Sequence, residues 1–326
     1  MAKLPQPPDA PGLTWRPPTI NDISLLADHT LRIHEVERLD FLASAEFFEW
    51  LLAQPGIDSA EDMLVGLIDD KIVADAGTWL HSGDAGARCI VWGEASPGHT
   101  NLAGFLLEWA KARAMQRLAA VPEQLPKVIR TSVEEHRSAQ RTAIEAAGFE
   151  EPRGFVTMAR RLSELPAAPN VPSGIQVVTW SDDLEEAVRV ASNTSFADHW
   201  GSLPMDAAEF GGFYRDSPTF RPDLSFLAIA NGSVVSFSLC GVDDEDNENR
   251  DTNDVFIERV GTVRSHRGQG LASLLILRSM QAAVSAGGLD RAALDVDERS
   301  HTDATLVYER LGFETLSRAL SYTITI

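Results

Sequence analysis

The chain has 326 residues and a formal net charge of −20, and 44% of its residues are hydrophobic. This length allows one or two domains, and the composition supplies enough apolar material for a core in each half. The acidic excess argues against a nucleic-acid partner, because phosphate binding needs basic patches. No apolar run reaches membrane-spanning length, so we expect no membrane partner.

The chain contains two cysteines, Cys89 and Cys240, which are too few for a disulfide framework or a metal cluster. No other histidine or cysteine spacing indicates a metal site. We therefore expect a protein of the reducing cytoplasm that holds no metal. The acidic run at residues 243–249 lacks the spacing of a calcium loop and is predicted to be a solvated loop.

Residues 1–12 are rich in proline and lack the hydrophobic core of a signal peptide, so a disordered leader is predicted here. A first domain is predicted over residues 13–165. It begins with a short strand and a helix capped near Asn21. Residues 63–79 then form a strand, a turn and a second strand.

Residues 166–174 contain three prolines and few large apolar groups, which is typical of an exposed linker. The second half, residues 175–326, repeats the order of the first. It also starts with a short strand and a capped helix, and residues 226–240 again form two strands around a turn. The last helical run of each half is followed by Gly-Phe, at residues 148–149 in the first half and at residues 312–313 in the second. The chain therefore reads as two related domains.

The segment at residues 264–272 follows an apolar, strand-like run and opens into a helical run that begins at Leu271. The unpaired N–H groups of a helix start, preceded by two glycines, suit a phosphate group. A nucleotide-triphosphatase loop needs Lys-Ser/Thr after the last glycine, and a dinucleotide loop needs a third glycine where Ser273 stands. Both are excluded. A strand-to-helix turn without a ligand remains the alternative.

A second motif lies downstream of this loop. Residues 292–297 are predicted to form a strand, and residues 304–311 a helix. Gly312 follows that helix, and glycine is the residue type that a helix C-terminus prefers.

Together the two motifs resemble the GCN5-related N-acetyltransferase (GNAT) family. Its acetyl-CoA pyrophosphate loop reads Gln/Arg-x-x-Gly-x-Gly/Ala, which Arg267, Gly270 and Ala272 match. The family's second motif consists of a strand, a turn and a helix. Residues 292–313 match it except at Ser300, where the family usually has asparagine. The resemblance implies an α/β (α+β) fold class: two tandem GNAT folds, each a mixed, mostly antiparallel sheet flanked by helices. It also implies acetyl-CoA as the co-substrate.

The two halves differ in the residues of this loop. Gly98 and Asn101 of the first half stand where the second half has the arginine and the central glycine. Ala143 stands at the position that matches Tyr308. We therefore expect residues 13–165 to be a degenerate GNAT domain that keeps the fold, and residues 175–326 to be the catalytic one.

By resemblance, one strand would pair its backbone with the pantetheine arm, and the loop would wrap the pyrophosphate. The residues expected to bind acetyl-CoA are Val260, Gly261, Thr262, Arg267, Gly268, Gln269, Gly270, Leu271, Ala272, Ser273 and Ser300.

Acetyl transfer to an amine requires a neutral amine, so its proton must be taken up by a base. The alternation of faces along a strand places Asp254 and Glu258 on one face of residues 254–262. The family often carries a base on this strand, and Glu258 is the first candidate and Asp254 the second. Alternatively, Glu258 is a surface partner of Arg259 or Arg264, and Asp254 faces solvent.

Tyr308 resembles the family's tyrosine that protonates the leaving CoA thiolate, a step for which a phenol is suited. A core aromatic is the alternative. The stretch at residues 196–201, Phe-x-Asp-His-Trp-Gly, resembles tandem bacterial acetyltransferases of the mycothiol synthase type. There we expect Asp198, His199 and Trp200 to bind the acceptor, with a structural turn as the alternative.

The resulting prediction is an acetyl-CoA-dependent N-acetyltransferase that acetylates a small-molecule amine by direct attack in a ternary complex. A mycothiol synthase-like reaction is the more specific form. A non-catalytic acyl-CoA-binding or regulatory module and a peptide N-acetyltransferase remain alternatives. Monomer and homodimer are both compatible with the sequence.

Overall fold

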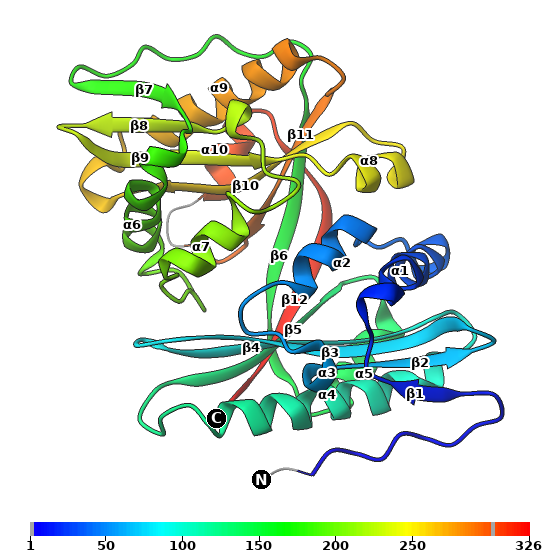
Figure 1. Cartoon of the computed structure of the whole chain (residues 1–326). Coiled ribbons are helices and arrows are strands. Elements are labelled where there is room, and N and C mark those ends of the chain that lie inside the picture. Colours follow the sequence, from blue (N-terminus) through cyan, green and yellow to red (C-terminus); the bar gives the residue numbers. More distant parts are fainter. Residues whose placement is uncertain (1–2, 301–303) are drawn as a thin grey trace. The chain divides into compact units, whose positions relative to one another are not determined.

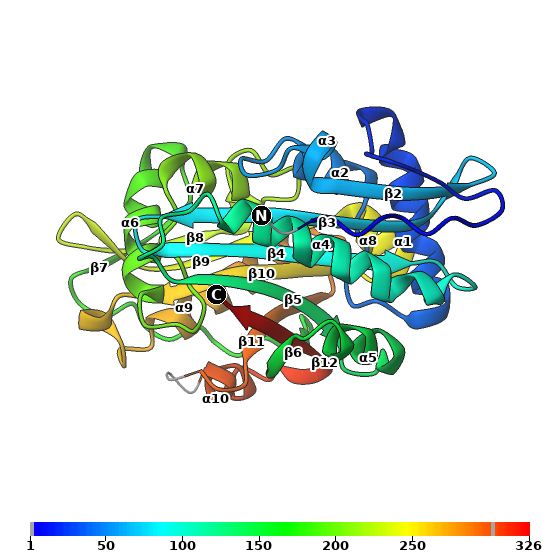
Figure 2. The same cartoon turned by 90° about the horizontal axis from the view of Figure 1, so that it is seen from below.

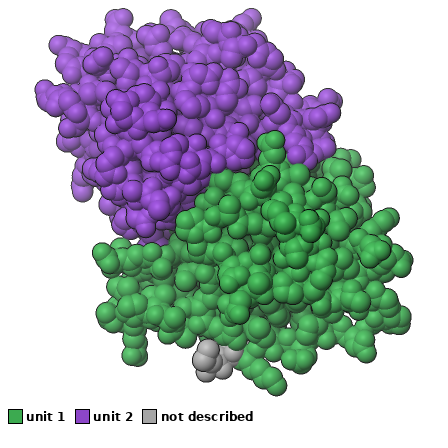
Figure 3. Space-filling view, viewed as in Figure 1, with its two compact units in different colours: residues 1–154, 319–326 green, residues 155–318 purple. Residues whose placement is uncertain are grey.

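The computed structural model describes residues 3–300 and 304–326. The chain divides into two compact units (Figure 3). Unit 1 comprises residues 1–154 and 319–326, and unit 2 comprises residues 155–318. No helix of the described part of the chain is long and apolar enough to cross a membrane.

Unit 1 is built on a sheet with the order β1-β2-β3-β4-β5-β12, in which β4 and β5 run parallel and the other neighbours antiparallel. Its strands are β1 (Thr14–Arg16), β2 (Met63–Ile68), β3 (Lys71–Gly83), β4 (Gly86–Ala95), β5 (Lys127–Glu134) and the end of β12 (Glu314–Thr325). Its helices are α1 (Ile23–Glu37), α2 (Ala45–Leu52), α3 (Ser59–Asp62), α4 (Ala103–Leu118) and α5 (Ser138–Ala146).

Helix α4 covers one face of this sheet, and α1 and α2 lie on the other (Figures 1 and 2). Leu106, Ala110 and Leu118 of α4 are buried, and their spacing places them on one side of the helix. They pack with Cys89 and Ile129 of the central strands to form the core of unit 1.

Unit 2 has the strand order β7-β8-β9-β10-β11-β6, and β10 and β11 are its parallel pair. Its strands are β6 (Glu150–Arg161, from residue 155 on), β7 (Ile175–Thr179), β8 (Phe226–Ala230), β9 (Ser233–Gly241), β10 (Asp254–Thr262) and β11 (Arg291–Asp297). Its helices are α6 (Glu185–Phe196), α7 (Ala207–Phe213), α8 (Asp244–Arg250), α9 (Leu271–Ala286) and α10 (Ala304–Arg310).

Helices α6 and α9 pack on opposite faces of β9 and β10. The hydroxyl of Ser238 on β9 lies 3.1 Å from that of Ser279 on α9. The neighbouring Phe237 points to the other face, where a methyl group at Gly261 would touch both Phe237 and Ser195 of α6. Both sheets have the predicted architecture: they are mixed, mostly antiparallel and flanked by helices.

The two halves of the sequence exchange their last strands, so that each unit contains a strand from the other half. Strand β6 ends the first half of the sequence, and its residues 155–161 pair with β11 inside unit 2. Strand β12 returns and pairs with β5 of unit 1 over residues 319–325. The compact units therefore differ from the predicted domains at 13–165 and 175–326. Residues 166–174 are mostly exposed, as expected of a linker, but they connect β6 and β7 within unit 2.

Two segments differ from what the sequence predicted for them, which was a disordered leader at residues 1–12 and a solvated loop at residues 243–249. Residues 3–12 form no helix or strand, but Leu4 packs against the core of unit 1. The Trp15 indole also donates a hydrogen bond to the Pro8 carbonyl at 3.1 Å, so these residues are held, unlike the disordered leader predicted. Residues 1 and 2 of that leader lie outside the described residues. The acidic run is helix α8, because the Asp243 side chain caps its first turn.

Candidate active site

Strands β10 and β11 separate part of the way along their length. They pair over residues 254–256 and 291–293. Beyond this point β10 continues along β9 to Thr262, whereas β11 continues along β6 to Asp297. The side of β10 that faces β11 therefore has no strand partner over residues 257–262 of the described chain. Open backbone groups of this kind can pair with an extended ligand.

A β-bulge lies where the two strands separate. Ile257 pairs with Cys240 and Arg259 with Leu239, so Glu258 is the extra residue in β10. A bulge interrupts the alternation of faces and re-aims the side chain. The sequence-based argument that placed Asp254 and Glu258 on one face therefore does not apply.

The environment of Glu258 suits a base. The residue stays open to solvent, but surrounding protein atoms displace enough water from the carboxylate to raise its pKa to about 8. Burial disfavours the charged form of a carboxylate, which explains the direction of the shift. A carboxylate with a pKa close to neutral pH can take up a proton and release it again.

Asp254, the second candidate base, lies in a buried ion pair. Its two carboxylate oxygens each accept a hydrogen bond from Arg291 at 2.6 Å. Arg250 approaches the same carboxylate at 3.7 Å, and Asn247 bonds to the Asp254 backbone. Asp254 therefore neither faces solvent nor is free to transfer a proton. It fastens the start of β10 to β11.

Replacing Asp254 with asparagine is expected to lower the free energy of unfolding by about 2–3 kcal/mol, because Arg291 would lose its buried counter-charge. Denaturant unfolding measures the change. The matched control is Asp290→Asn, since Asp290 pairs with Arg161 at 2.8 Å in an exposed position. That variant should lose less than about 1 kcal/mol. Equal losses in the two variants would contradict the structural role of Asp254.

The loop between β10 and α9 presents its glycines in the left-handed region. Gly268 has a φ of 77° and Gly270 a φ of 75°, and Gly270 directly precedes α9. Residues 268–270 are exposed, and no side chain caps the N-terminus of α9. The free N–H groups at the start of a 16-residue helix favour an anion. Leu271, Ala272 and Ser273 form this first turn.

The Arg267 side chain is held by protein groups. Its guanidinium donates to the Thr262 carbonyl at 3.1 Å and to the Ser195 carbonyl at 2.9 Å. It also lies 3.1 Å from Asp198 Oδ2, and this bond holds the pKa of Asp198 below its usual value. The predicted cofactor residue Arg267 and the predicted acceptor residue Asp198 are thus brought together. They join the glycine loop to the C-terminal end of α6.

The other two predicted acceptor residues follow in the same turn. The His199 ring packs against Phe196 with centroids 4.6 Å apart, and burial lowers its pKa. The Trp200 ring lies 6.2 Å from that of Phe155 on β6. Both side chains are half-buried, so they combine packing with access to solvent.

Sequence reasoning missed Arg259, which follows the bulge. Its guanidinium lies 4.0 Å from the Phe196 ring centroid and donates to the Ser192 hydroxyl at 2.8 Å. Arg259 thus fixes β10 to α6. No sequence pattern could have indicated this, because the bulge decides where the side chain points.

Tyr308 lies on α10 and packs against Phe313, with ring centroids 6.1 Å apart. Burial raises the pKa of its phenol to about 12, so the hydroxyl stays protonated at neutral pH and can donate a proton. Ser300 lies in the turn after β11, where its N–H donates to the Asp297 carbonyl at 3.0 Å. Residues 301–303 of this motif lie outside the described residues.

In unit 1, the corresponding region lies where β4 and β5 separate, and side chains of unit 1 form hydrogen bonds and ion pairs there. Strands β4 and β5 also pair only at their start, over residues 87–90 and 127–130. The Gln140 amide donates to the Gly93 carbonyl at 2.7 Å, and Arg137 pairs with Glu94 at 2.6 Å. The register of β3 and β4 shows no bulge. That residues 13–165 form a degenerate domain stays a prediction.

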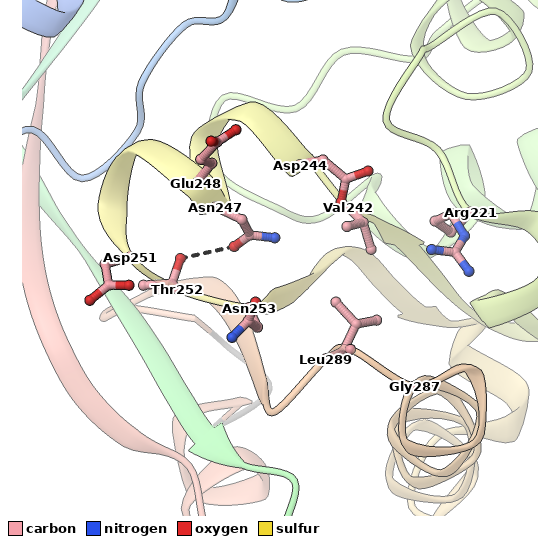
Figure 4. A pocket seen from close by; sticks show the side chains of 11 residues that line it. Arg221, Val242, Asp244, Asn247, Glu248, Asp251, Thr252, Asn253, Gly287 and Leu289 are labelled. Carbon is pink, nitrogen blue, oxygen red and sulfur yellow. Dashed lines mark hydrogen bonds between the residues drawn. The ribbon is translucent and has the colours of Figure 1, made fainter.

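A polar pocket of about 420 Å³ lies at the other end of α9, beside Gly287 and Leu289 (Figure 4). Asn247 and Thr252, which are hydrogen-bonded at 2.9 Å, line it together with acidic residues of α8. It is separate from the glycine loop, because the length of α9 lies between them. Within the described residues, no group of three or more His, Cys, Asp or Glu side chains could hold a metal ion.

The chain resembles known proteins in sequence and in fold. The model of the acetyltransferase (GNAT) family matches residues 186–313. A mycothiol acetyltransferase from Mycolicibacterium vanbaalenii is 30% identical over 192 residues, which cover 56% of this chain and 60% of that protein. The match therefore spans less than two thirds of that relative.

Two solved structures resemble nearly the whole chain. The GCN5-related N-acetyltransferase from Sphaerobacter thermophilus has a TM-score of 0.73 at 21% identity, covering 99% of this chain and 97% of that one. A tandem GNAT protein from the clavulanic acid biosynthesis pathway has a TM-score of 0.71 at 18% identity, covering 96% and 98%. The fold is therefore that of a tandem GNAT protein. Residues 186–313, which the GNAT family model matches, lie within unit 2 of this fold.

Proposed function

We propose that this protein transfers an acetyl group from acetyl-CoA to the amine of a small molecule, within unit 2. The observation that carries the proposal is the continuous path from the open side of β10 to the N-terminus of α9. An extended pantetheine arm can pair with residues 260–262, and a pyrophosphate can bind the N–H groups that follow Gly268 and Gly270. Acetyl-CoA, when bound, supplies the thioester.

Glu258 and Tyr308 provide the proton transfers. Glu258 takes a proton from the acceptor's ammonium group, because an amine attacks a carbonyl only when neutral. The new C–N bond forms as the C–S bond breaks, and Tyr308 gives its proton to the departing sulfur. Backbone N–H groups of β10 polarise the thioester carbonyl. The second proton of the nitrogen then restores the Tyr308 phenol, and Glu258 releases its proton to solvent, so the sum is one amide, one free CoA thiol and one proton.

The acceptor is proposed to lie against Asp198, His199 and Trp200, which form the turn beside the glycine loop. Their carboxylate, imidazole and indole groups suit an amine-bearing ligand. A matched relative is a mycothiol acetyltransferase, so a mycothiol synthase-like acetylation is the finer candidate.

The direct test mixes the protein with acetyl-CoA and a panel of amines and follows the release of free thiol. We expect turnover with at least one amine and binding of acetyl-CoA in the absence of amine. Binding without turnover on any amine would favour the non-catalytic acyl-CoA-binding module. Turnover only on peptides would favour the peptide N-acetyltransferase.

Replacing Gly270 with alanine is expected to weaken acetyl-CoA binding about tenfold, because an L-residue at a φ of 75° costs about 1–2 kcal/mol and shifts the loop. Calorimetric titration measures the dissociation constant. Gly287→Ala is the matched control, since Gly287 has a φ of 80° at the opposite end of α9. It should lower stability and leave the affinity unchanged. Equal affinities in the two variants would refute the pyrophosphate site.

A further inference from the structure

Gly241, the last residue of β9, lies directly against the side chain of Glu258. A Cβ atom built on Gly241 would come within 2.1 Å of Glu258 Oε1 and 2.9 Å of its carboxyl carbon. The φ of Gly241 lies outside the left-handed region, so the backbone itself would accept alanine. Glycine is therefore required at this position for space and not for conformation.

The backbone around Gly241 cannot move aside to admit a side chain. The third neighbour of the Cβ position is the Thr219 carbonyl oxygen, at 3.3 Å. That oxygen accepts a hydrogen bond from Val242 N–H at 2.8 Å, and Arg221 N–H donates to the Cys240 carbonyl at 2.8 Å. Gly241 itself bridges to Phe220 and is paired with Phe256 of β10. The Glu258 side chain is the one neighbour able to turn away.

We propose that Gly241 is a positioning residue for the acetyl transfer: the space beside its Cα holds the Glu258 carboxylate against the end of β9. This inference rests on the proposed role of Glu258 as the base. A bulge at Glu258 turns the carboxylate toward β9, and a glycine at the facing position leaves room for it. With a methyl group in that space, the carboxylate must rotate outward into water and away from the acceptor amine.

The test is the variant Gly241→Ala, assayed by thiol release over a range of pH. A displaced base is expected to lower kcat by about 10–100-fold, because displacements of about 1 Å at a reacting group have effects of this size. The carboxylate would also regain water, so the pKa that limits the rate should fall from near 8 toward that of an ordinary glutamate. The dissociation constant of acetyl-CoA should not change.

The matched control is Gly83→Ala at the end of β3, where a Cβ atom would meet nothing within 4 Å. Its kcat and pH profile should equal those of the unaltered protein. A purely structural role of Gly241 would lower the amount of folded protein and leave the pH profile unchanged. An unchanged pH profile in Gly241→Ala therefore overturns the inference.

The double variant Gly241→Ala, Glu258→Asp decides the case in which Gly241→Ala does not fold. The shorter aspartate retreats from the added methyl group, so folding should recover, and the double variant should be no less active than Glu258→Asp alone. If the double variant does not fold, the added methyl group collides with Thr219 and the inference is overturned.

If Glu258→Gln is fully active, the proposed base is wrong. If Glu258→Gln is inactive and Gly241→Ala normal, only the inference on Gly241 is wrong.

Discussion

Replacing Glu258 with glutamine is expected to lower kcat/KM by about 10²–10⁴-fold at neutral pH, the range that a general base contributes. Glutamine keeps the size and shape of the side chain but cannot take up the proton of the amine. The measurement is thiol release with the best acceptor from the amine panel. The effect should fall on turnover and leave the affinity for acetyl-CoA unchanged.

The pH dependence gives the sharper form of this result. A base works only when deprotonated, and the pKa of Glu258 is raised to about 8. The kcat/KM of the unaltered protein should therefore rise with pH and level off above about 8. The glutamine variant should lack this rise. Asp254→Asn serves as the control, since Asp254 lies in the ion pair with Arg291. The kcat/KM of the folded Asp254→Asn protein should still rise with pH. A rise that persists in Glu258→Gln would assign the base to another group.

Replacing Tyr308 with phenylalanine is expected to lower kcat by about 10²-fold or more, because the leaving thiolate loses its proton donor. Phenylalanine keeps the packing against Phe313 and the rest of the surrounding core. Stability and the dissociation constant of acetyl-CoA should thus change little. A single-turnover measurement with saturating acetyl-CoA separates the chemical step from binding.

The matched control for this variant is Tyr322→Phe in unit 1. Tyr322 is buried and donates its hydroxyl proton to Glu145 at 3.0 Å. Removing that hydroxyl should lower stability by about 1 kcal/mol and leave kcat unchanged. A Tyr308→Phe variant with normal kcat would reduce Tyr308 to a core aromatic, the alternative that the sequence left open.

The glycine loop was the part of the site most accessible to sequence reasoning. Gly268 and Gly270 have the positive φ that a strand-to-helix phosphate loop needs, and helix α9 begins at Leu271 as predicted. These features are local: they depend on a few consecutive residues and on the unpaired N–H groups of a helix start. Local patterns of this kind can be interpreted without knowing the rest of the fold.

The roles of the charged residues depended on distant parts of the chain. Arg267 was predicted to bind the cofactor, but its guanidinium is held by Ser195 and Asp198, about seventy positions earlier in the sequence. Asp254 was predicted from strand alternation, but Arg291 of the next strand in the sheet neutralises it. Neither partner could be found from periodicity, because both pairs form only when the sheet and helices assemble.

The amino-acid sequence by itself determined the two related sheets, the glycine turn before α9 and the candidate acid and base. Only the tertiary structure decided that β6 and β12 are exchanged between the two halves of the sequence, that Glu258 sits in a bulge, and that Gly241 makes room for it. The physical reason is the same in each case. Turns, caps and helices are stabilised by neighbours along the chain, whereas strand pairing, register and close contacts are selected by groups far apart in sequence.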